Sequence, residues 1–223
     1  MGRRQTDESR ALPRVATKIC GLSTAETLDA AIGSGASHVG FVFLPQSPRH
    51  LTFEQAAGLA GRVPERVGRV GVFVDPDDAL LGKAIDAGRL GALQLHKVGR
   101  ERAAAIAARF RLPMWIAIAV RTRADLDEAQ GWKGIAERLV YDAKTPAGAL
   151  PGGMGLRFDW KLLDGFAHPL PWVLSGGLSP DNVGEAIGVT RARMVDVSSG
   201  VESAPGVKDV DKIASFLQAV ARS

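Results

Sequence analysis

Residues 172–202 read WVLSGGLSPDNVGEAIGVTRARMVDVSSGVE and contain one complete repeat of the pattern that organises the chain. The short apolar run Trp172–Leu174 leads into a glycine turn, a short helical stretch covers Pro180–Ile187, and the next apolar run is Met194–Val197. Apolar runs that alternate with helices are typical of a parallel sheet buried on both faces. This stretch therefore predicts an α/β fold.

The same alternation extends back to Val15 and gives eight apolar runs in all. Besides the two runs above, these are Val15–Cys20, His38–Leu44, Gly68–Val74, Ala92–Leu95, Met114–Val120 and Arg138–Asp142. Apolar residues recur at helical spacing between or after the runs, at Thr52–Arg62, Arg100–Phe110 and Val207–Ala221, and more weakly at Ala124–Gln130.

Eight such units either close into a barrel or form an open, doubly wound sheet. Residues 15–223 supply about 26 residues for each unit, which falls within the range of the (β/α)8 barrel. An open nucleotide-binding sheet usually has a Gly-x-Gly-x-x-Gly turn after its first strand, and the segment Ile19-Cys20-Gly21-Leu22-Ser23 lacks it. No change in composition divides the chain. We predict a single-domain TIM barrel over residues 15–223.

The first fourteen residues are polar and rich in arginine. They contain Arg3, Arg4, Arg10 and Arg14, so the net charge of +4 is partly a property of this segment. They lack the apolar core of a signal peptide, and we predict a disordered lead-in over residues 1–14. No run of Lys and Arg exceeds two residues, which disfavours a nucleic-acid partner.

The single cysteine, Cys20, excludes an intrachain disulfide and a cysteine-based zinc site, and it favours a reducing compartment. No apolar stretch reaches the roughly eighteen residues of a membrane span. These features predict a cytoplasmic protein without a membrane partner, and we expect a monomer or a weak homodimer.

Glycine clusters follow the last three predicted strands. The three loops are Gly152-Gly153-Met154-Gly155, Ser175-Gly176-Gly177 and Ser198-Ser199-Gly200. In (β/α)8 barrels the active site lies at the C-terminal ends of the strands, often with a phosphate beside the loops after strands seven and eight. Glycine lets backbone N–H groups approach an anion closely. The clusters therefore predict a site for a phosphorylated small molecule, although each cluster alone is also explained by a tight turn.

Two side chains with proton-transfer chemistry stand at strand ends. Strand alternation places Cys20 on the same face as Lys18, whose charge favours a thiolate, although a lone cysteine is most often a small buried hydrophobic residue. Asp142 ends the sixth run, so its carboxyl group faces the predicted barrel mouth or caps a turn.

Three further polar residues occupy similar positions. Asp196 is flanked by apolar residues on the last run, so its charge needs a partner or a ligand. His96 follows the fourth run and is either a ligand contact or a satisfied polar residue at the rim. Arg49 lies in the loop after the second run, where it is either a surface cation or a planar group that binds a ligand carboxylate.

These motifs, in this order, resemble the phosphoribosylanthranilate isomerase family of tryptophan biosynthesis. One such segment would be unspecific, but the ordered set is highly specific and covers about residues 15–220. Its main segments are Lys18-Ile19-Cys20-Gly21-Leu22, Ser47-Pro48-Arg49, Leu93-Gln94-Leu95-His96, Asp142-Ala143-Lys144-Thr145-Pro146, Gly152-Gly153-Met154-Gly155, Phe158-Asp159-Trp160, Leu174-Ser175-Gly176-Gly177-Leu178 and Val195-Asp196-Val197-Ser198-Ser199-Gly200-Val201-Glu202.

The resemblance implies the Amadori rearrangement of N-(5′-phosphoribosyl)anthranilate to 1-(2-carboxyphenylamino)-1-deoxyribulose 5-phosphate, without a metal or organic cofactor. It implies that Cys20 is the general base, Asp142 the general acid, and Arg49 the group that binds the anthranilate carboxylate. The reaction itself needs an acid at the ribose ring oxygen and a base at C2′. The remaining candidate substrate-binding residues are His96, Gly155, Gly176, Gly177, Asp196, Ser198, Ser199 and Gly200.

Two positions depart from the family pattern without touching the acid or the base. Lys97 stands where the family commonly has glycine, and Met154 replaces a threonine or serine. The alternatives are a dual-substrate isomerase that also serves histidine biosynthesis and a non-catalytic phosphosugar-binding barrel. The former carries an aspartate at the end of its first strand, where this chain has Cys20, and the presence of both Cys20 and Asp142 disfavours the latter.

Overall fold

The computed structural model describes residues 15–146 and 155–223. The predicted lead-in over residues 1–14 lies outside the described residues, and so do Gly152, Gly153 and Met154 of the predicted phosphate-binding loops. The last residue of that loop, Gly155, is described.

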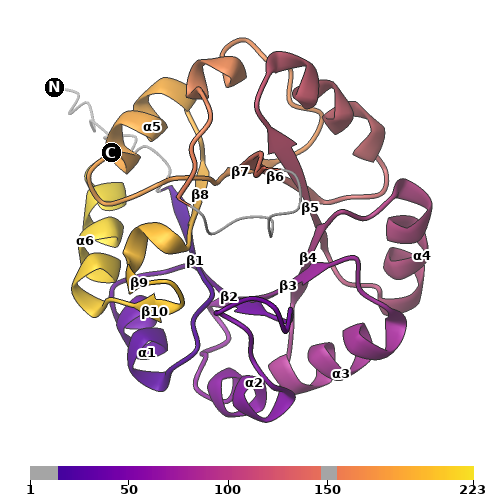
Figure 1. The fold of residues 1–223 in the computed structure, drawn as a ribbon, viewed down its shortest axis with the longest axis vertical. Coiled ribbons are helices and arrows are strands. Elements are labelled where there is room, and N and C mark those ends of the chain that lie inside the picture. The colour runs from indigo at the N-terminus through magenta and orange to yellow at the C-terminus, as the bar shows by residue number, and fades with distance from the viewer. Residues whose placement is uncertain (1–14, 147–154) are drawn as a thin grey trace, which may run out of the picture.

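Eight parallel strands close into a barrel, and helices surround it on the outside (Figure 1). Their bounds are β1 (Ala16–Cys20), β2 (His38–Val42), β3 (Gly68–Val74), β4 (Ala92–His96), β5 (Met114–Val120), β6 (Arg138–Ala143), β7 (Trp172–Leu174) and β8 (Met194–Val197). Each strand pairs with the next along the chain, and β1 closes the barrel against β8. The predicted TIM barrel is confirmed, and each predicted run matches its strand to within two residues at either end.

The elements outside the barrel are α-helices and shorter 3-10 segments. Their bounds are α1 (Ala25–Gly33), α2 (Phe53–Ala60), α3 (Asp78–Gly88), α4 (Arg100–Phe110), α5 (Val183–Thr190), α6 (Val210–Ala221), η1 (Arg123–Trp132), η2 (Trp160–Leu163) and η3 (Ser199–Val201). Thr24, Thr52, Asp77 and Asp209 cap α1, α2, α3 and α6 because their side chains accept a backbone N–H of the first turn.

The predicted helix over Val207–Ala221 is wrong in its first three residues. Val207 and Lys208 form β10, which pairs antiparallel with β9 (Glu202–Ala204), and α6 begins only at Val210. Asp209 sets this start, since its carboxylate accepts the backbone N–H of Lys212 at 3.0 Å. The β9–β10 hairpin is therefore an element that apolar spacing did not reveal.

Two other predicted helices differ in type or position. The weak prediction at Ala124–Gln130 corresponds to the 3-10 segment η1. The prediction at Pro180–Ile187 begins too early, because the Asn182 side chain accepts the Ser179 N–H at 2.8 Å and holds a turn ahead of α5.

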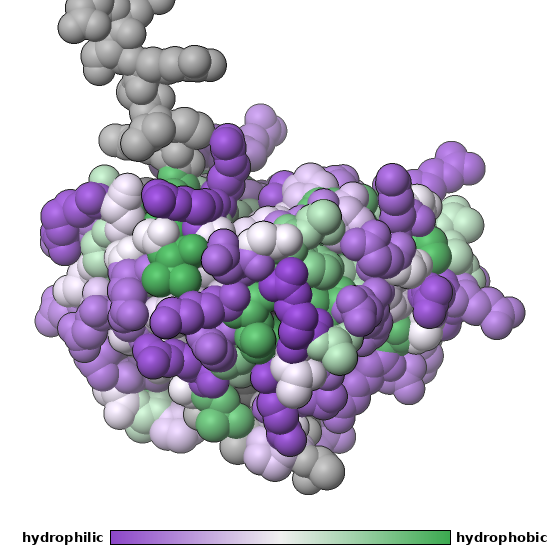
Figure 2. All heavy atoms as spheres, turned by 90° about the horizontal axis from the view of Figure 1, so that it is seen from above, coloured by the Kyte–Doolittle hydropathy of each residue, from purple (hydrophilic) through white to green (hydrophobic). Residues whose placement is uncertain are grey.

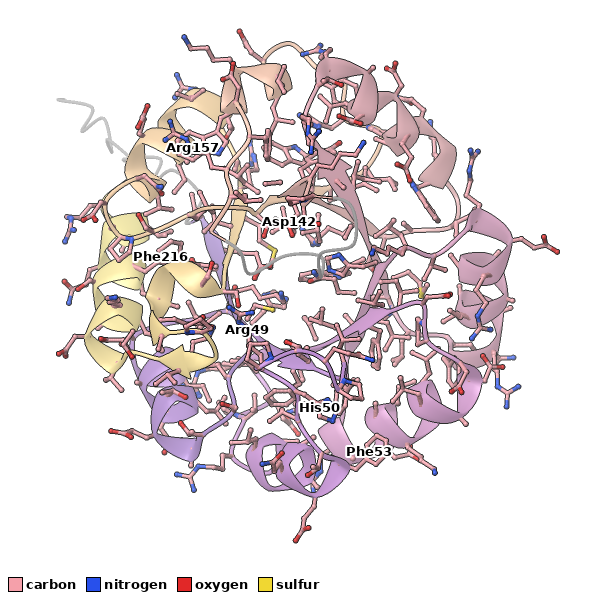
Figure 3. The ribbon with its side chains drawn as sticks, viewed as in Figure 1. Arg49, His50, Phe53, Asp142, Arg157 and Phe216 are labelled. Atoms are coloured by element: carbon pink, nitrogen blue, oxygen red, sulfur yellow. The ribbon has the colours of Figure 1, made fainter. Side chains whose placement is uncertain are left out.

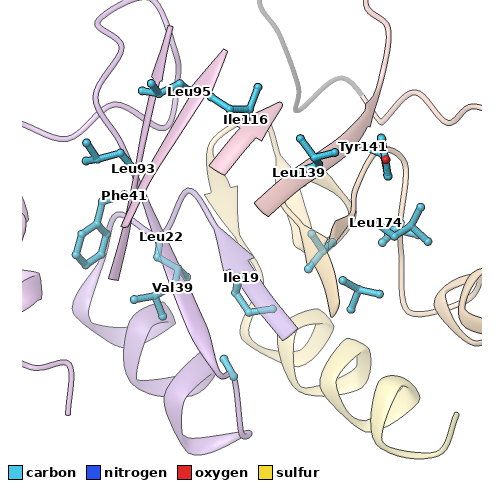
Figure 4. Packing of buried hydrophobic residues seen from close by; sticks show 14 of the residues in the cluster. Ile19, Leu22, Val39, Phe41, Leu93, Leu95, Ile116, Leu139, Tyr141 and Leu174 are labelled. Carbon is cyan, nitrogen blue, oxygen red and sulfur yellow. The ribbon is translucent and has the colours of Figure 1, made fainter. Parts of the chain in front are cut away.

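Strand alternation divides the buried side chains between the two faces of the barrel wall. The residues that point outward pack against the helices and include Ile19, Val39, Phe41, Leu93, Ile116 and Leu139 (Figure 4). A second, inward cluster fills the barrel nearer the N-terminal ends of the strands and consists of Val70, Ala92, Trp115, Val140, Val173 and Met194. This apolar layer closes one end of the barrel interior.

Inward positions nearer the C-terminal ends of the strands are mainly polar. They include Cys20, Gln94, His96, Asp142, Ser175, Asp196 and Ser198, which all line one cavity. The apolar layer therefore packs the end of the barrel interior nearer the N-terminal ends of the strands. The polar layer nearer the C-terminal ends, which we call the upper layer, places functional groups around one cavity.

The outer surface is mainly hydrophilic on the face seen in Figure 2, where hydrophobic residues appear as separate patches. Across residues 15–146 and 155–223, no helix combines the length and apolar character needed to cross a membrane.

Candidate active site

The first layer of the site is an ion pair between neighbouring strands. Lys18 on β1 pairs in register with Asp196 on β8, and Lys18 Nζ lies 2.9 Å from Asp196 Oδ1. Both residues are buried. Burial opposes the charge of Lys18, but Asp196 and Cys20 outweigh it and raise the pKa of the ammonium. Lys18 is thus the partner that the apolar neighbours of Asp196 led us to expect for its charge.

Cys20 ends β1 two residues beyond Lys18 and lines the cavity with its side chain. Its neighbour Gly40 on β2 makes room for it, because a Cβ at Gly40 would lie 2.9 Å from Cys20 Sγ. Burial raises the pKa of the Cys20 thiol above its ordinary value, whereas the nearby charge of Lys18 lowers it. Lys18 therefore assists the thiolate as predicted, but burial dominates.

Asp142 lies near the end of β6 and faces the same cavity as Cys20. Its Oδ1 accepts the N–H of Ala143 at 2.9 Å. Burial raises the pKa of the Asp142 carboxyl to about 7, and the negative charge of Asp196 adds to this effect. A carboxyl group in this environment retains its proton at mildly acidic pH, which suits a proton donor.

His96 ends β4 and is buried beside Gln94, whose Nε2 lies 3.1 Å from His96 Nε2. Burial lowers the pKa of His96 to about 4, with further contributions from the charges of Lys18 and Lys97. The imidazole is therefore neutral at physiological pH and lines the cavity as a polar, uncharged group.

Arg49 is buried, so the interpretation as a surface cation does not hold. Its Nε and Nη2 each donate to a carboxylate oxygen of Glu202 at 2.7 Å. Burial opposes the charge of Glu202, but the hydrogen bonds from Arg49 and the nearby Lys208 outweigh it and hold the pKa of Glu202 below its usual value. Arg49 lies within the ring of strands and lines the cavity that it shares with Asp142 (Figure 3).

The glycine turns meet beside Asp142. Gly176 and Gly177 both have positive φ, at 85° and 65°, which side-chain-bearing residues rarely adopt. A Cβ on Gly176 would lie 2.9 Å from Asp142 Oδ1, and one on Gly200 would lie 1.8 Å from the carbonyl oxygen of Leu178. These turns therefore require glycine for packing, whatever they bind.

The cavity around Cys20 encloses about 630 Å³, including space open to solvent. A smaller space of about 350 Å³ adjoins it, because both are lined by Asp142, Ser175, Asp196 and Ser198. The predicted phosphate-binding residues of this second space are Gly155, Gly176, Gly177, Ser198 and Ser199. Gly200 lines a neighbouring groove with Arg49 and Ser199.

Comparison with known proteins addresses the family directly. The family model described as N-(5′-phosphoribosyl)anthranilate (PRA) isomerase matches residues 17–219. The chain belongs to this family. The predicted family, the isomerase class and the place in tryptophan biosynthesis are thereby confirmed.

Individual relatives agree in sequence and in structure. An N-(5′-phosphoribosyl)anthranilate isomerase of Zymomonas mobilis subsp. pomaceae is 52% identical over 208 residues, covering 92% of this chain and 98% of the relative. The crystal structure of phosphoribosyl anthranilate isomerase from Thermotoga maritima matches with a TM-score of 0.84 at 36% identity, covering 94% of this chain and 100% of that one. A phosphoribosyl anthranilate isomerase in complex with reduced 1-(o-carboxyphenylamino)-1-deoxyribulose 5-phosphate matches with a TM-score of 0.82 at 34% identity and the same coverage.

One departure from the pattern of the isomerase family has a visible structural consequence. Lys97 adopts a positive φ of 55°, in the left-handed region where glycine is favoured. It directly follows His96, so a residue under backbone strain adjoins the cavity. The other departure, Met154, lies outside the described residues.

Two buried residues of the isomerase barrel were missed as site residues. Glu202 pairs with Arg49, and Lys208 Nζ donates to Glu202 and to the carbonyl oxygen of Ser198, the latter at 3.0 Å. Lys208 gave no signal because its segment was interpreted as a helix, where a lysine is usually exposed. In the described part of the chain, no group of three or more His, Cys, Asp or Glu residues is arranged to hold a metal.

Proposed function

We propose that the chain converts N-(5′-phosphoribosyl)anthranilate to 1-(2-carboxyphenylamino)-1-deoxyribulose 5-phosphate, with Asp142 as general acid and Cys20 as general base. The observation that carries this proposal is that Cys20 and Asp142 line one cavity, which continues into the glycine turns after β6, β7 and β8. A substrate with a reacting sugar and a terminal phosphate fits that arrangement.

The first step opens the ribose ring. Asp142 donates its proton to the ring oxygen, the bond from that oxygen to C1′ breaks, and the nitrogen lone pair forms an iminium. The raised pKa of Asp142, about 7, supports this role because a carboxyl with an ordinary pKa would be ionised near neutrality. No other carboxyl that lines the cavity is as suited, since Asp196 is engaged by Lys18.

The second step removes the proton on C2′. The Cys20 thiolate accepts this proton, the electrons of the C–H bond form the enolamine, and the iminium nitrogen is neutralised. The enolamine then tautomerises to the ketone. Because the iminium attracts these electrons, a thiolate is a sufficiently strong base and the step needs no metal.

The two ends of the substrate have separate binding groups. Arg49 binds the anthranilate carboxylate, since a guanidinium offers planar, directional donors to a carboxylate. Backbone N–H groups at Gly155, Gly177, Ser199 and Gly200 donate hydrogen bonds to the phosphate oxygens. Asp196, Ser198 and His96 line the space between these ends. The chain is further proposed to act in the cytoplasm, as a monomer or weak homodimer, without a cofactor.

The deciding experiment is turnover of freshly generated phosphoribosylanthranilate, followed by loss of its fluorescence. The full chain should accelerate this loss, and a Cys20→Ser variant should accelerate it far less. A protein that binds the substrate but leaves its fluorescence decay unchanged would establish a binding-only barrel instead. Parallel turnover of the aminoaldose of histidine biosynthesis would establish a dual-substrate isomerase.

A further inference from the structure

The β9–β10 hairpin brings two opposite charges into the barrel mouth. Glu202 begins β9 and Lys208 ends β10, and their exposed fractions are only 8% and 7%. A lysine is rarely this buried unless its charge is paired. The hairpin lies outside the eight strands of the barrel, so barrel closure alone does not explain why it carries these residues inward.

The Lys208 ammonium is connected to the backbone of Cys20 through a single hydroxyl group. Lys208 Nζ donates to the carbonyl oxygen of Ser198 at 3.0 Å and to Ser198 Oγ at 3.2 Å. Ser198 Oγ in turn donates to the carbonyl oxygen of Cys20 at 3.2 Å. Lys208 also donates to Glu202, so all three of its protons are used and its position is fixed.

The counterion of Lys208 is shared, whereas that of Lys18 is not. Glu202 accepts two hydrogen bonds from Arg49 at 2.7 Å and one from the N–H of Gly206 at 3.2 Å, in addition to that from Lys208. Asp196, the counterion of Lys18, otherwise accepts only from the Ser175 hydroxyl, at 3.4 Å, among described residues. Lys18 is therefore neutralised more completely than Lys208.

We propose that Lys208 is a positioning residue of the acid–base site, whose incompletely neutralised charge favours the Cys20 thiolate and whose hydrogen bonds hold Ser198 in place. The proposal rests on the proposed role of Cys20 as general base. It assigns the hairpin a function in the reaction. The hairpin places a second ammonium group, after that of Lys18, where its charge opposes the effect of burial on the pKa of the Cys20 thiol.

Arg49, His96 and Asp142 share the cavity with Cys20, but the charged groups that shift the pKa of its thiol lie on three other elements. Lys18 on β1 and Lys208 on β10 both lower the pKa of the thiol, while Asp196 on β8 raises it in addition to burial. Burial lowers the pKa of Lys208 itself, but the charges of Glu202 and Cys20 oppose this effect and favour the ammonium form. The directions agree with the proposed role of Lys208.

The test measures alkylation of Cys20 by iodoacetamide as a function of pH, in the full chain and without substrate. Because Cys20 is the only cysteine, the mass increase reports this residue alone. Lys208→Met should move the midpoint of the profile upward by roughly one pH unit and slow alkylation about tenfold at neutral pH. Lys208→Gln, which keeps hydrogen-bond donors without the charge, should give the same shift even where the Met variant folds poorly. Lys208→Arg, which keeps the positive charge, should give the wild-type profile.

Lys212→Met is the matched control. Lys212 on α6 donates to the backbone carbonyl of Glu202 at 2.8 Å, so its loss removes a charge from the same segment without removing one that faces Cys20. Its profile should match wild type. An unshifted profile in Lys208→Gln, or an equal shift in Lys212→Met, would show that Lys208 only anchors the hairpin. The readout needs no turnover, so absence of isomerase activity in the wild type would overturn the proposed function separately.

Discussion

The two ends of the barrel interior use the same eight strands but different residue types. The layer nearer the N-terminal ends is apolar and contains Val70, Ala92, Trp115, Val140, Val173 and Met194. The layer nearer the C-terminal ends contains ionisable and polar groups such as Lys18, Cys20, His96, Asp142 and Asp196. Individual strands contribute to both layers, as β6 does with Val140 and Asp142. Position along a strand therefore determines whether a substitution should affect stability or catalysis.

The largest expected difference between the effects of the two layers comes from removing the acid or the base. Asp142→Asn and Cys20→Ser should each lower kcat by about 10²–10⁴-fold, since each removes one positioned proton-transfer group. Both variants should unfold at nearly the wild-type temperature and still bind product, because neither change alters the size of the side chain greatly. Steady-state kinetics and thermal melts measure the two effects. A Cys20→Ser variant that retains more than about a tenth of kcat would contradict the role of Cys20 and make His96 the next candidate base.

The converse change is made in the apolar layer. Trp115 is buried, with its ring centroid 5.3 Å from that of His38 and the Arg138 guanidinium 5.2 Å from its centroid. Trp115→Ala should lower the free energy of unfolding by about 3–5 kcal/mol through the cavity that it leaves. In protein that remains folded, kcat should be close to wild type.

Urea unfolding measures the loss, and Phe53→Ala provides the control at a partly exposed aromatic residue. Phe53 is 38% exposed, so its removal should cost clearly less. A large loss of kcat in folded Trp115→Ala would mean that the two layers are not independent.

A change at Arg49 tests whether separate groups of the upper layer bind the carboxylate and the phosphate of the substrate. Arg49→Lys should weaken inhibitors that carry a benzoate carboxylate by about 10–100-fold, because a lysine cannot reproduce paired, planar donors. Binding of inorganic phosphate should change much less. Competition experiments with matched inhibitors that have and lack the carboxylate give both values. Equal losses for the two inhibitors would show that Arg49 supports the fold of the mouth through Glu202 and does not contact the carboxylate.

The sequence allowed the barrel and most of the polar strand ends to be predicted, because both depend on local periodicity. Alternation along β1 was enough to place Lys18 and Cys20 on one face, and the apolar neighbours of Asp196 indicated that its charge needs a partner or a ligand. The pairing of Arg49 with Glu202 was not predictable in this way, since the residues are 153 positions apart and meet only when the barrel closes. The β9–β10 hairpin was missed because Val207, three residues ahead of Val210, continues the apolar spacing of the helix that follows.

The glycine turns show a different limit of prediction. Packing and anion binding both require glycine at these positions, so sequence could not separate them. The contacts at Gly177 and Gly200 also show that bulky replacements there would disturb backbone groups of the neighbouring loops. Changes in KM at these glycines would therefore be mixed with changes in folding, whereas Ser199→Ala removes a polar group that lines the second space without a steric conflict.

The pH profile depends on the order in which the two upper-layer groups ionise. Active molecules need the Cys20 thiolate together with the protonated Asp142. Burial raises the pKa of Asp142 to about 7 and raises the pKa of Cys20 above its ordinary value. Asp142 therefore loses its proton at lower pH than Cys20, and only a minority of free enzyme molecules carry both required forms.

The expected profile of kcat/KM follows from this order. Below about pH 7 the rate rises with pH, because thiolate increases while Asp142 stays protonated. Between the two pKa values the gain in thiolate is offset by the loss of protonated Asp142, which gives a plateau. Above the pKa of Cys20 the rate falls. A profile that already falls through pH 7 would show that the Cys20 thiol ionises at lower pH than Asp142 in the free enzyme.

The smallest expected effect concerns the strained backbone of Lys97 at the mouth. A side-chain-bearing residue in the left-handed region costs about 1 kcal/mol or more, whereas glycine costs roughly 0.5–1 kcal/mol through the entropy of the unfolded chain. Lys97→Gly should therefore change the free energy of unfolding by less than about 1 kcal/mol, most simply as a gain.

Arg111→Gly is the matched change away from the mouth. Arg111 has a φ of 54°, close to the 55° of Lys97, but it ends α4 and precedes the N-terminal end of β5. Chemical unfolding should give similar stability changes for the two variants. Only Lys97→Gly should alter KM for the substrate, because Lys97 directly follows His96, which lines the cavity. Equal kinetic effects would mean that the strain at Lys97 has no connection with the site, since Arg111 reaches the barrel from its apolar end.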